Sequence, residues 1–140
     1  MGINKARTQR WTSKNDPDPE NPTVFHIGVL DQIIKTHIED ESTQFIPSSN
    51  DPEGEAEIKI LFSKRTLLTI KFGVLKIENF FDPGSKKTVT VEAEEIVIFG
   101  QKYSALPDKA LAAFPPGKWI SELTTQILKL NSLSEDEIKN

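Results

Sequence analysis

The sequence predicts an α+β fold, in which an antiparallel, bent β-meander of three to four strands is covered by an N-terminal helix and by C-terminal helices. Residues 55–100 alternate apolar and polar side chains, a pattern that is typical of strands with one buried face. The flanking segments 23–40 and 118–130 instead repeat apolar side chains every three or four residues, which indicates amphipathic helices. A chain of 140 residues is long enough to bury a core, so we expect a single domain.

The N-terminal segment 1–22 differs from the rest of the chain in composition. Residues 1–14 carry four basic side chains and no acidic one, and residues 15–22 carry three acidic side chains and three prolines. Closely spaced prolines disfavour a helix and keep the chain extended. The segment is therefore predicted to be an extended or disordered arm.

Trp11 is an unusual residue for such an arm, because a large aromatic side chain can anchor in a pocket or stack on a base. Three interpretations are open: Trp11 rests on its own domain, docks to a partner, or contacts nucleic acid. The first is favoured, and four cations are few for contacting a phosphate backbone. The candidate interaction residues of the arm are Lys5, Arg7, Arg10, Trp11 and Lys14.

The segment Thr23–Asp40 is predicted to be the first helix, with Thr23 as its N-cap. Its apolar stripe consists of Ile27, Leu30, Ile34 and Ile38. Thr43–Ile46 is expected to form a short edge strand that ends at Pro47, and residues 47–54 have the composition of a loop.

The first part of the central segment is predicted to be a hairpin of strands 55–62 and 66–72. The register that places Ile58 opposite Ile70 keeps the apolar side chains on one face. A slip of one residue would turn a whole apolar set to the wrong face, so this register is preferred.

The second predicted hairpin pairs residues 70–81 with residues 87–98. Its register gives two cross-strand pairs that we expect to observe, Lys76–Glu92 and Ile77–Val91. The turn between the strands contains Pro83 and Gly84, which predicts a type II turn with Gly84 in the left-handed region.

Both strands of this hairpin change their apolar phase at the same level, where Gly73 is predicted to lie opposite Glu95. We interpret this coincidence as a bulged corner that either wraps the sheet around a helix or opens a pocket. A Glu95 side chain pointing into the corner would have a raised pKa, but the favoured interpretation is that it points outward. The candidate pocket or interface residues are Gly73, Glu95, Tyr103 and Trp119.

The C-terminal part is predicted to be helical. Residues 107–114 resemble a short helix with proline in its first turn, and 118–130 form a longer amphipathic helix. The expected organisation is an arm at 1–22, a single α+β domain at 23–131 and an acidic tail at 132–140, in which Ser134–Glu137 cap one last turn.

No catalytic or metal-binding pattern is recognisable in the sequence. The chain has no cysteine, its glycines are isolated from one another, and its two histidines lack a second ligand at helical spacing. We therefore expect no enzyme activity, no cofactor and no metal. The longest apolar runs are shorter than the ~20 residues of a spanning helix, and no secretion signal is recognisable, so a cytoplasmic or nuclear location is expected.

These observations favour a small, non-enzymatic protein–protein interaction module, such as an adaptor, an inhibitor, a chaperone-like protein or an assembly subunit. It would act through a sheet edge and the arm, with another protein as partner and a homodimer as an open possibility. One alternative is a domain that binds a small molecule in a pocket under the bent sheet. The other is weak nucleic-acid binding through the arm, which the net charge of −4 disfavours for the folded body.

Overall fold

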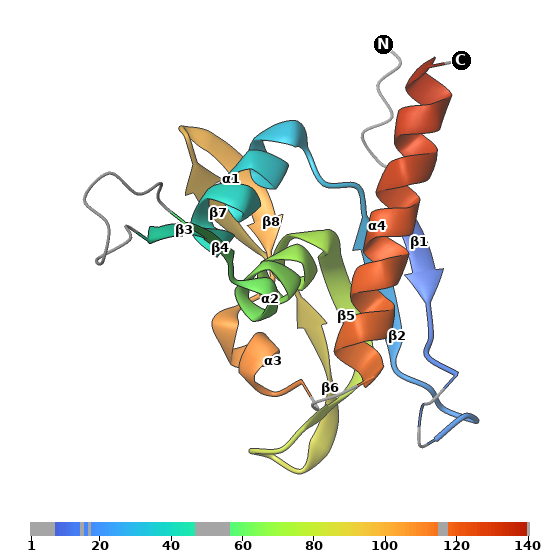
Figure 1. Cartoon of the computed structure of the whole chain (residues 1–140). Helices are drawn as coiled ribbons and strands as arrows, with labels where there is room; N and C mark the ends of the chain where they lie inside the picture. Colours follow the sequence, from blue (N-terminus) through green and yellow to red (C-terminus); the bar gives the residue numbers. More distant parts are fainter. Residues whose placement is uncertain (1–7, 15, 17, 47–56, 115–117, 140) are drawn as a thin grey trace.

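The computed structural model describes residues 8–14, 16, 18–46, 57–114 and 118–139, and it combines helices with antiparallel strands (Figure 1). The elements, in chain order, are β1 (Thr8–Trp11), β2 (Val24–Gly28), α1 (Gln32–Ser42), β3 (Thr43–Ile46), β4 (Glu57–Ile60), α2 (Phe62–Gly73), β5 (Val74–Asp82), β6 (Lys87–Glu92), β7 (Glu94–Ile98), β8 (Gln101–Ala105), α3 (Asp108–Ala112) and α4 (Lys118–Lys139). The predicted α+β class is confirmed. The loop predicted at 47–54 lies outside the described residues.

The main sheet has four antiparallel strands in the order β1-β2-β5-β6. Two further pairs, β3–β4 and β7–β8, form separate two-stranded sheets. The long helix α4 runs alongside β1 and β2, whereas α3 lies nearer to β6 (Figure 1). The two edge strands of the main sheet therefore have different surroundings.

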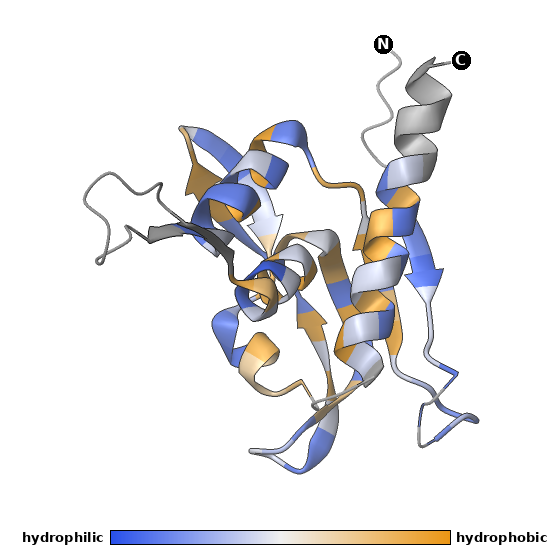
Figure 2. Cartoon of the chain, viewed as in Figure 1, coloured by the Kyte–Doolittle hydropathy of each residue, from blue (hydrophilic) through white to orange (hydrophobic). Residues whose placement is uncertain are grey.

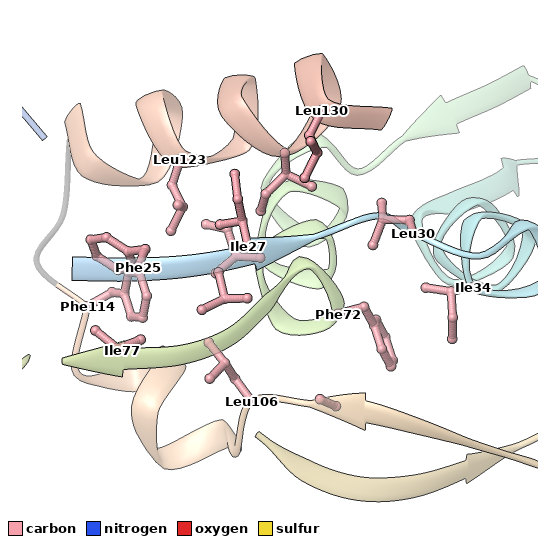
Figure 3. Packing of buried hydrophobic residues seen from close by; sticks show 14 of the residues in the cluster. Phe25, Ile27, Leu30, Ile34, Phe72, Ile77, Leu106, Phe114, Leu123 and Leu130 are labelled. Atoms are coloured by element: carbon pink, nitrogen blue, oxygen red, sulfur yellow. The ribbon is translucent and has the colours of Figure 1, made fainter. Parts of the chain in front are cut away.

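The hydrophobic core lies between one face of the main sheet and the helices. Phe25 and Ile27 of β2, Ile77 of β5, and Leu123 and Ile127 of α4 are all fully buried. Figure 3 shows α4 running along β2 with Leu123 directed toward that strand. Burial of each such side chain contributes about 1.5–3 kcal/mol to the free energy of unfolding, so the contact between α4 and the sheet is a principal source of stability. In Figure 2, β2 is largely apolar, whereas β1 and the turn between β5 and β6 are hydrophilic.

The predicted first helix, Thr23–Asp40, is wrong in its first part, because residues 24–28 form the strand β2. The helix α1 begins later, at Gln32, where the Asp31 side chain accepts a hydrogen bond of 2.7 Å from the backbone amide of Ile33. The strand is buried on both sides along most of its length, so its apolar residues do not alternate clearly. A strand of this kind resembles part of a helical stripe in the sequence.

The predicted strand 66–72 is also wrong, because these residues belong to the helix α2. Its buried residues Thr69, Ile70, Phe72 and Gly73 follow helical spacing. The predicted pair Ile58–Ile70 therefore does not form, and Ile58 of β4 lies opposite Phe45 of β3. The edge strand predicted at Thr43–Ile46 is confirmed as β3.

The corner predicted at Gly73 and Glu95 is wrong as well. Gly73 is the last residue of α2, and Glu95 lies opposite Ser104 in the β7–β8 pair. Gly73 instead permits a close approach of two helices, since a Cβ atom there would lie 2.8 Å from two carbons of the Ile127 side chain on α4. The change of apolar phase at Gly73 marks the boundary between α2 and β5, and the change near Glu95 marks the boundary between β6 and β7.

The hairpin of β5 and β6 has the predicted pairs Lys76–Glu92 and Ile77–Val91. A bulge follows, after which Phe80 faces Val89. Within the bulge Asn79 has a φ of 57°, and its side-chain amide donates to Asn21 Oδ1 (3.1 Å) and to the carbonyl of Pro22 (3.3 Å). The bulge thus binds the segment that leads into β2.

The turn of this hairpin is not of the predicted type. Gly84 does not have a positive φ, whereas Lys86 has a φ of 59°. The backbone amide of Lys86 donates to the carbonyl of Asp82 over 2.8 Å, so the left-handed residue closes the turn immediately before β6. The Asp82 carboxylate accepts a hydrogen bond from the Gly84 amide, which stabilises the same turn.

The C-terminal elements agree with the prediction at α3 and over the first part of α4. The predicted separate last turn is wrong, because α4 continues without interruption to Lys139. The strand β8, which pairs with β7, was not among the predicted strands.

Candidate functional site

The described residues of the predicted arm lie against the domain. Lys5 and Arg7 are outside the described residues, whereas Arg10 and Trp11 belong to the edge strand β1. The Trp11 ring lies 5.7 Å from the Phe25 ring, measured between centroids, and is partly buried. Trp11 therefore rests on its own domain, in agreement with the favoured interpretation.

The segment after β1 is attached to α4. The Ser13 hydroxyl donates a hydrogen bond of 2.8 Å to the Glu122 carboxylate of α4. A groove of about 340 Å³ lies here, and its lining residues are Trp11, Thr12, Lys14, Ser121, Glu122, Thr125 and Gln126. The groove brings two predicted interaction residues, Trp11 and Lys14, to one place.

The four residues predicted to share a pocket lie on four different elements. Glu95 of β7 is exposed and lies 3.6 Å from the Lys102 ammonium group, as the outward interpretation predicts. Trp119 of α4 packs edge-on against Phe25, with 5.8 Å between ring centroids. Gly73 contacts α4, and Tyr103 of β8 donates from its hydroxyl to Gln101 Oε1 over 3.0 Å. Partial burial, together with the negative charge of Asp31, raises the pKa of Tyr103.

The edge strand β6 has side chains that are exposed along most of its length. Its sequence, KTVTVE, alternates threonine and valine, contains no proline and is charged only at its two ends. In the described part of the chain no strand pairs with its outer side. An uncovered strand of β-branched residues is the type of edge that accepts another strand.

The direction of the backbone groups of β6 follows from one hydrogen bond. The amide of Ala93 donates to the carbonyl of Leu75 over 3.0 Å, so residue 93 faces β5. Because successive residues of a strand direct their backbone groups to opposite sides, Val91 and Val89 also face β5. The amides and carbonyls of Thr88, Thr90 and Glu92 are consequently directed away from the sheet.

A groove of about 300 Å³ lies behind β6, between the hairpin and α3. Its apolar lining comes from Phe80, Val89, Val91, Pro107, Ala110 and Ala113, and its rim carries Asp82, Glu92 and Lys109. The helix α3 is held beside the groove by the burial of Ala110 and of Phe114, which follows the helix, and at its start Lys71 Nζ lies 2.7 Å from Asp108 Oδ1. The groove can therefore receive apolar side chains that enter from the β6 edge.

The Asp82 carboxylate at the rim is ionised near neutral pH. Hydrogen bonds from the Ser85 side chain and the Gly84 backbone amide lower the pKa of Asp82 below its usual range, so this carboxylate stays ionised. Together with Lys109 it presents both signs of charge around an apolar centre. This arrangement is typical of a surface that contacts protein.

The outer face of the main sheet carries a row of polar residues across all four strands. Arg10, His26, Lys76 and Glu92 are successive cross-strand neighbours. In the adjacent row Glu78 Oε2 lies 2.6 Å from His26 Nε2, and this hydrogen bond lowers the pKa of Glu78. The sequence analysis did not predict this cluster. It placed His26 in a helix and therefore did not pair the segment around His26 with the strand that contains Glu78.

A third groove, of about 500 Å³, lies between the N-terminal parts of α2 and α4. Phe62, which is 70% exposed, and Leu67 line it together with Ile120 and Thr124. Among the described residues no group of three histidine or acidic side chains is arranged to hold a metal ion. Within the same residues, no helix combines the length and apolar character needed to cross a membrane.

Comparison of the chain with protein-family models, with curated proteins and with solved structures finds no match. The candidate site is therefore defined by geometry alone. It consists of the open edge of β6 and the apolar groove behind it.

Proposed function

We propose that the protein is a non-enzymatic protein–protein interaction module that binds an extended strand of a protein at the β6 edge. The observation that carries the proposal is the coincidence of an uncovered edge with an apolar groove lined by the same strand. Backbone hydrogen bonds along an edge supply affinity, and pockets for alternate side chains supply specificity.

The two parts of the site are matched in spacing. A strand added beside β6 would direct every second side chain to the face on which Val89 and Val91 lie. Apolar side chains at these positions would lie over the groove, whereas the intervening side chains would face solvent. The preferred ligand is thus an extended segment that alternates apolar and polar residues.

Photo-cross-linking in the native cell tests this proposal. A photoreactive amino acid at Thr88, on the open edge, should give covalent adducts with protein, whereas the same group at Gln9 on β1 should give few. Thr90→Pro removes an amide that faces outward and should abolish the adducts, since proline cannot donate to an added strand. Equal adducts from the two edges, or none from Thr88, would contradict the proposal.

A neighbouring proline provides the matched control for folding. The amide of Val89 faces β5, so Val89→Pro should lower the free energy of unfolding by about 3 kcal/mol. Thr90→Pro should cost about 1 kcal/mol or less, because its missing amide lies on the open side. Denaturant titration of both variants therefore separates loss of binding from loss of the fold.

A further inference from the structure

We infer that the strand added at β6 is the β6 strand of a second copy of this chain, in antiparallel orientation. This inference rests on the proposed function and assigns its partner. It is carried by the self-complementarity of the strand, both in its backbone groups and in its side chains.

The outward backbone groups define one register for the pair. Thr88, Thr90 and Glu92 face outward, and a two-fold axis perpendicular to the sheet at Thr90 pairs all three. Thr90 then lies opposite Thr90 of the other copy, and Thr88 lies opposite Glu92. All of the outward amides and carbonyls of the strand are used in this register. A shift by one pair would place either Glu92 opposite Lys86 or Thr88 opposite Glu94, and both of these partners lie outside β6.

The side chains agree with this register. Val89 of each copy lies opposite Val91 of the other, on the face that lines the groove. The threonines at the axis face each other on the outer surface. Pairs of β-branched residues and pairs of threonines are favourable cross-strand neighbours. The valines contributed by the second copy would cover the open side of the apolar groove.

The charges of the strand favour the antiparallel arrangement. Lys86 and Lys87 are exposed at its start, and Glu92 and Glu94 are exposed at and just beyond its end. Antiparallel pairing brings the basic start of one copy to the acidic end of the other, at both ends of the interface. A parallel pair would place like charges side by side, which is unfavourable.

Disulfide trapping tests the register directly, because the natural chain has no cysteine. In Thr90→Cys the two Cα atoms across the axis should be about 5.5 Å apart, within the range of a disulfide bond. Mild oxidation of the purified protein should therefore give a covalent dimer. Val89→Cys, which lies opposite Val91, and Gln9→Cys on β1 should form dimers far more slowly.

Charge reversal gives an independent measurement. Lys86→Glu should weaken dimerisation by about tenfold in sedimentation equilibrium, because both ends of the interface lose an attraction and gain a repulsion. Adding Glu92→Lys to this variant should restore part of the affinity, whereas Glu92→Lys alone should weaken the dimer.

Two results would overturn the inference: a wild-type protein that sediments as a monomer at high concentration, or disulfide formation at position 90 no faster than at positions 89 and 9. Neither would overturn the proposed function, which depends on adducts at Thr88. An adduct with the mass of two chains supports self-pairing, and an adduct with a different protein supports strand addition without self-pairing.

Discussion

The two edges of the main sheet differ in length, in charge and in the elements that they adjoin. The β1 edge is four residues long, carries Arg10, and is anchored by Trp11 on Phe25 and by the Ser13–Glu122 hydrogen bond. The β6 edge is six residues long, is charged only at its ends, and adjoins a groove. Sheets usually protect their edges with short strands, charges or covering elements. The β1 edge has two of these protections, a short strand and the charge of Arg10, whereas β6 is longer and uncharged along its centre, so we propose β6 as the binding edge.

The largest effect is expected for Gly73→Val, which should lower the free energy of unfolding by about 3 kcal/mol. A Cβ atom 2.8 Å from the Ile127 side chain forces α4 away from α2. Because β1 is attached to α4 whereas β6 adjoins α3, hydrogen exchange should lose more protection in β1 and β2 than in β5 and β6. Gly84→Val is the matched control: its Cβ would meet Asp82 at an ordinary 3.5 Å, and the effect should be under about 1 kcal/mol. Equal loss of hydrogen-exchange protection at both edges would show that β1 does not depend on α4 more than β6 does.

A smaller effect is expected for Trp11→Ala, which should lower the free energy of unfolding by about 2 kcal/mol, because the side chain is only partly buried. The change should loosen β1 and turn the protected edge into a second open one, so self-association should increase. A double-mutant cycle with Phe25→Leu should give a coupling energy of about 1 kcal/mol between the two rings. A coupling energy of zero, together with unchanged hydrogen exchange in β1, would show that Trp11 does not stabilise this edge.

The smallest effect concerns pH. The hydrogen bond from His26 lowers the pKa of Glu78 below 4.5, so the folded state binds this proton more weakly than the unfolded state. The contribution of Glu78 is therefore present above pH 4.5 and is lost as the pH falls through the lower folded pKa. Glu78→Gln should make stability less dependent on pH in this acidic range. Asp82→Asn, near β6, should act in the same direction, because the Ser85 and Gly84 hydrogen bonds also lower its pKa. A steeper dependence in either variant would contradict this sign.

The sequence was informative where a segment has two distinct faces. The β5–β6 hairpin alternates clearly, and its pairs Lys76–Glu92 and Ile77–Val91 were predicted correctly. The strand β3 and most of α4 were also found. In each of these segments only one periodicity, that of a strand or that of a helix, places the apolar residues on one face.

The prediction was wrong for segments whose apolar residues do not show the periodicity of the structure that they form. In β2, Val24, Phe25 and Ile27 are all buried, so the strand lost its alternation and was read as the start of a helix. In α2, Leu68, Ile70 and Phe72 happen to alternate, although the helix is fixed by packing against its neighbours. No local property of the chain distinguishes these cases, since tertiary contacts override weak propensities.

The candidate site was predicted only in its general form. A free sheet edge was expected but not assigned to β6, and the corner predicted at Gly73 and Glu95 is wrong. The groove behind β6 depends on α3, which lies close to α2: the Lys71 ammonium group is 2.7 Å from the Asp108 carboxylate, although the two residues are 37 positions apart in the sequence. Such a pairing cannot be read from periodicity, because it requires the positions of α2 and α3 in space.

The order of the strands has a consequence for how the chain folds. Two of the strand pairs, β1–β2 and β5–β6, join segments that are close in the sequence. The central pair joins β2 to β5, which are far apart in the sequence. Beside it the Thr23 hydroxyl donates a hydrogen bond to the carbonyl of Asn79, 56 residues away. Contacts between distant segments carry a larger loop-closure cost and form later. We therefore expect the β5–β6 hairpin to appear before the sheet is assembled. The β6 strand would then be accessible to another molecule during folding, when its inner face is also uncovered, and refolding at high protein concentration should favour association over the monomeric fold.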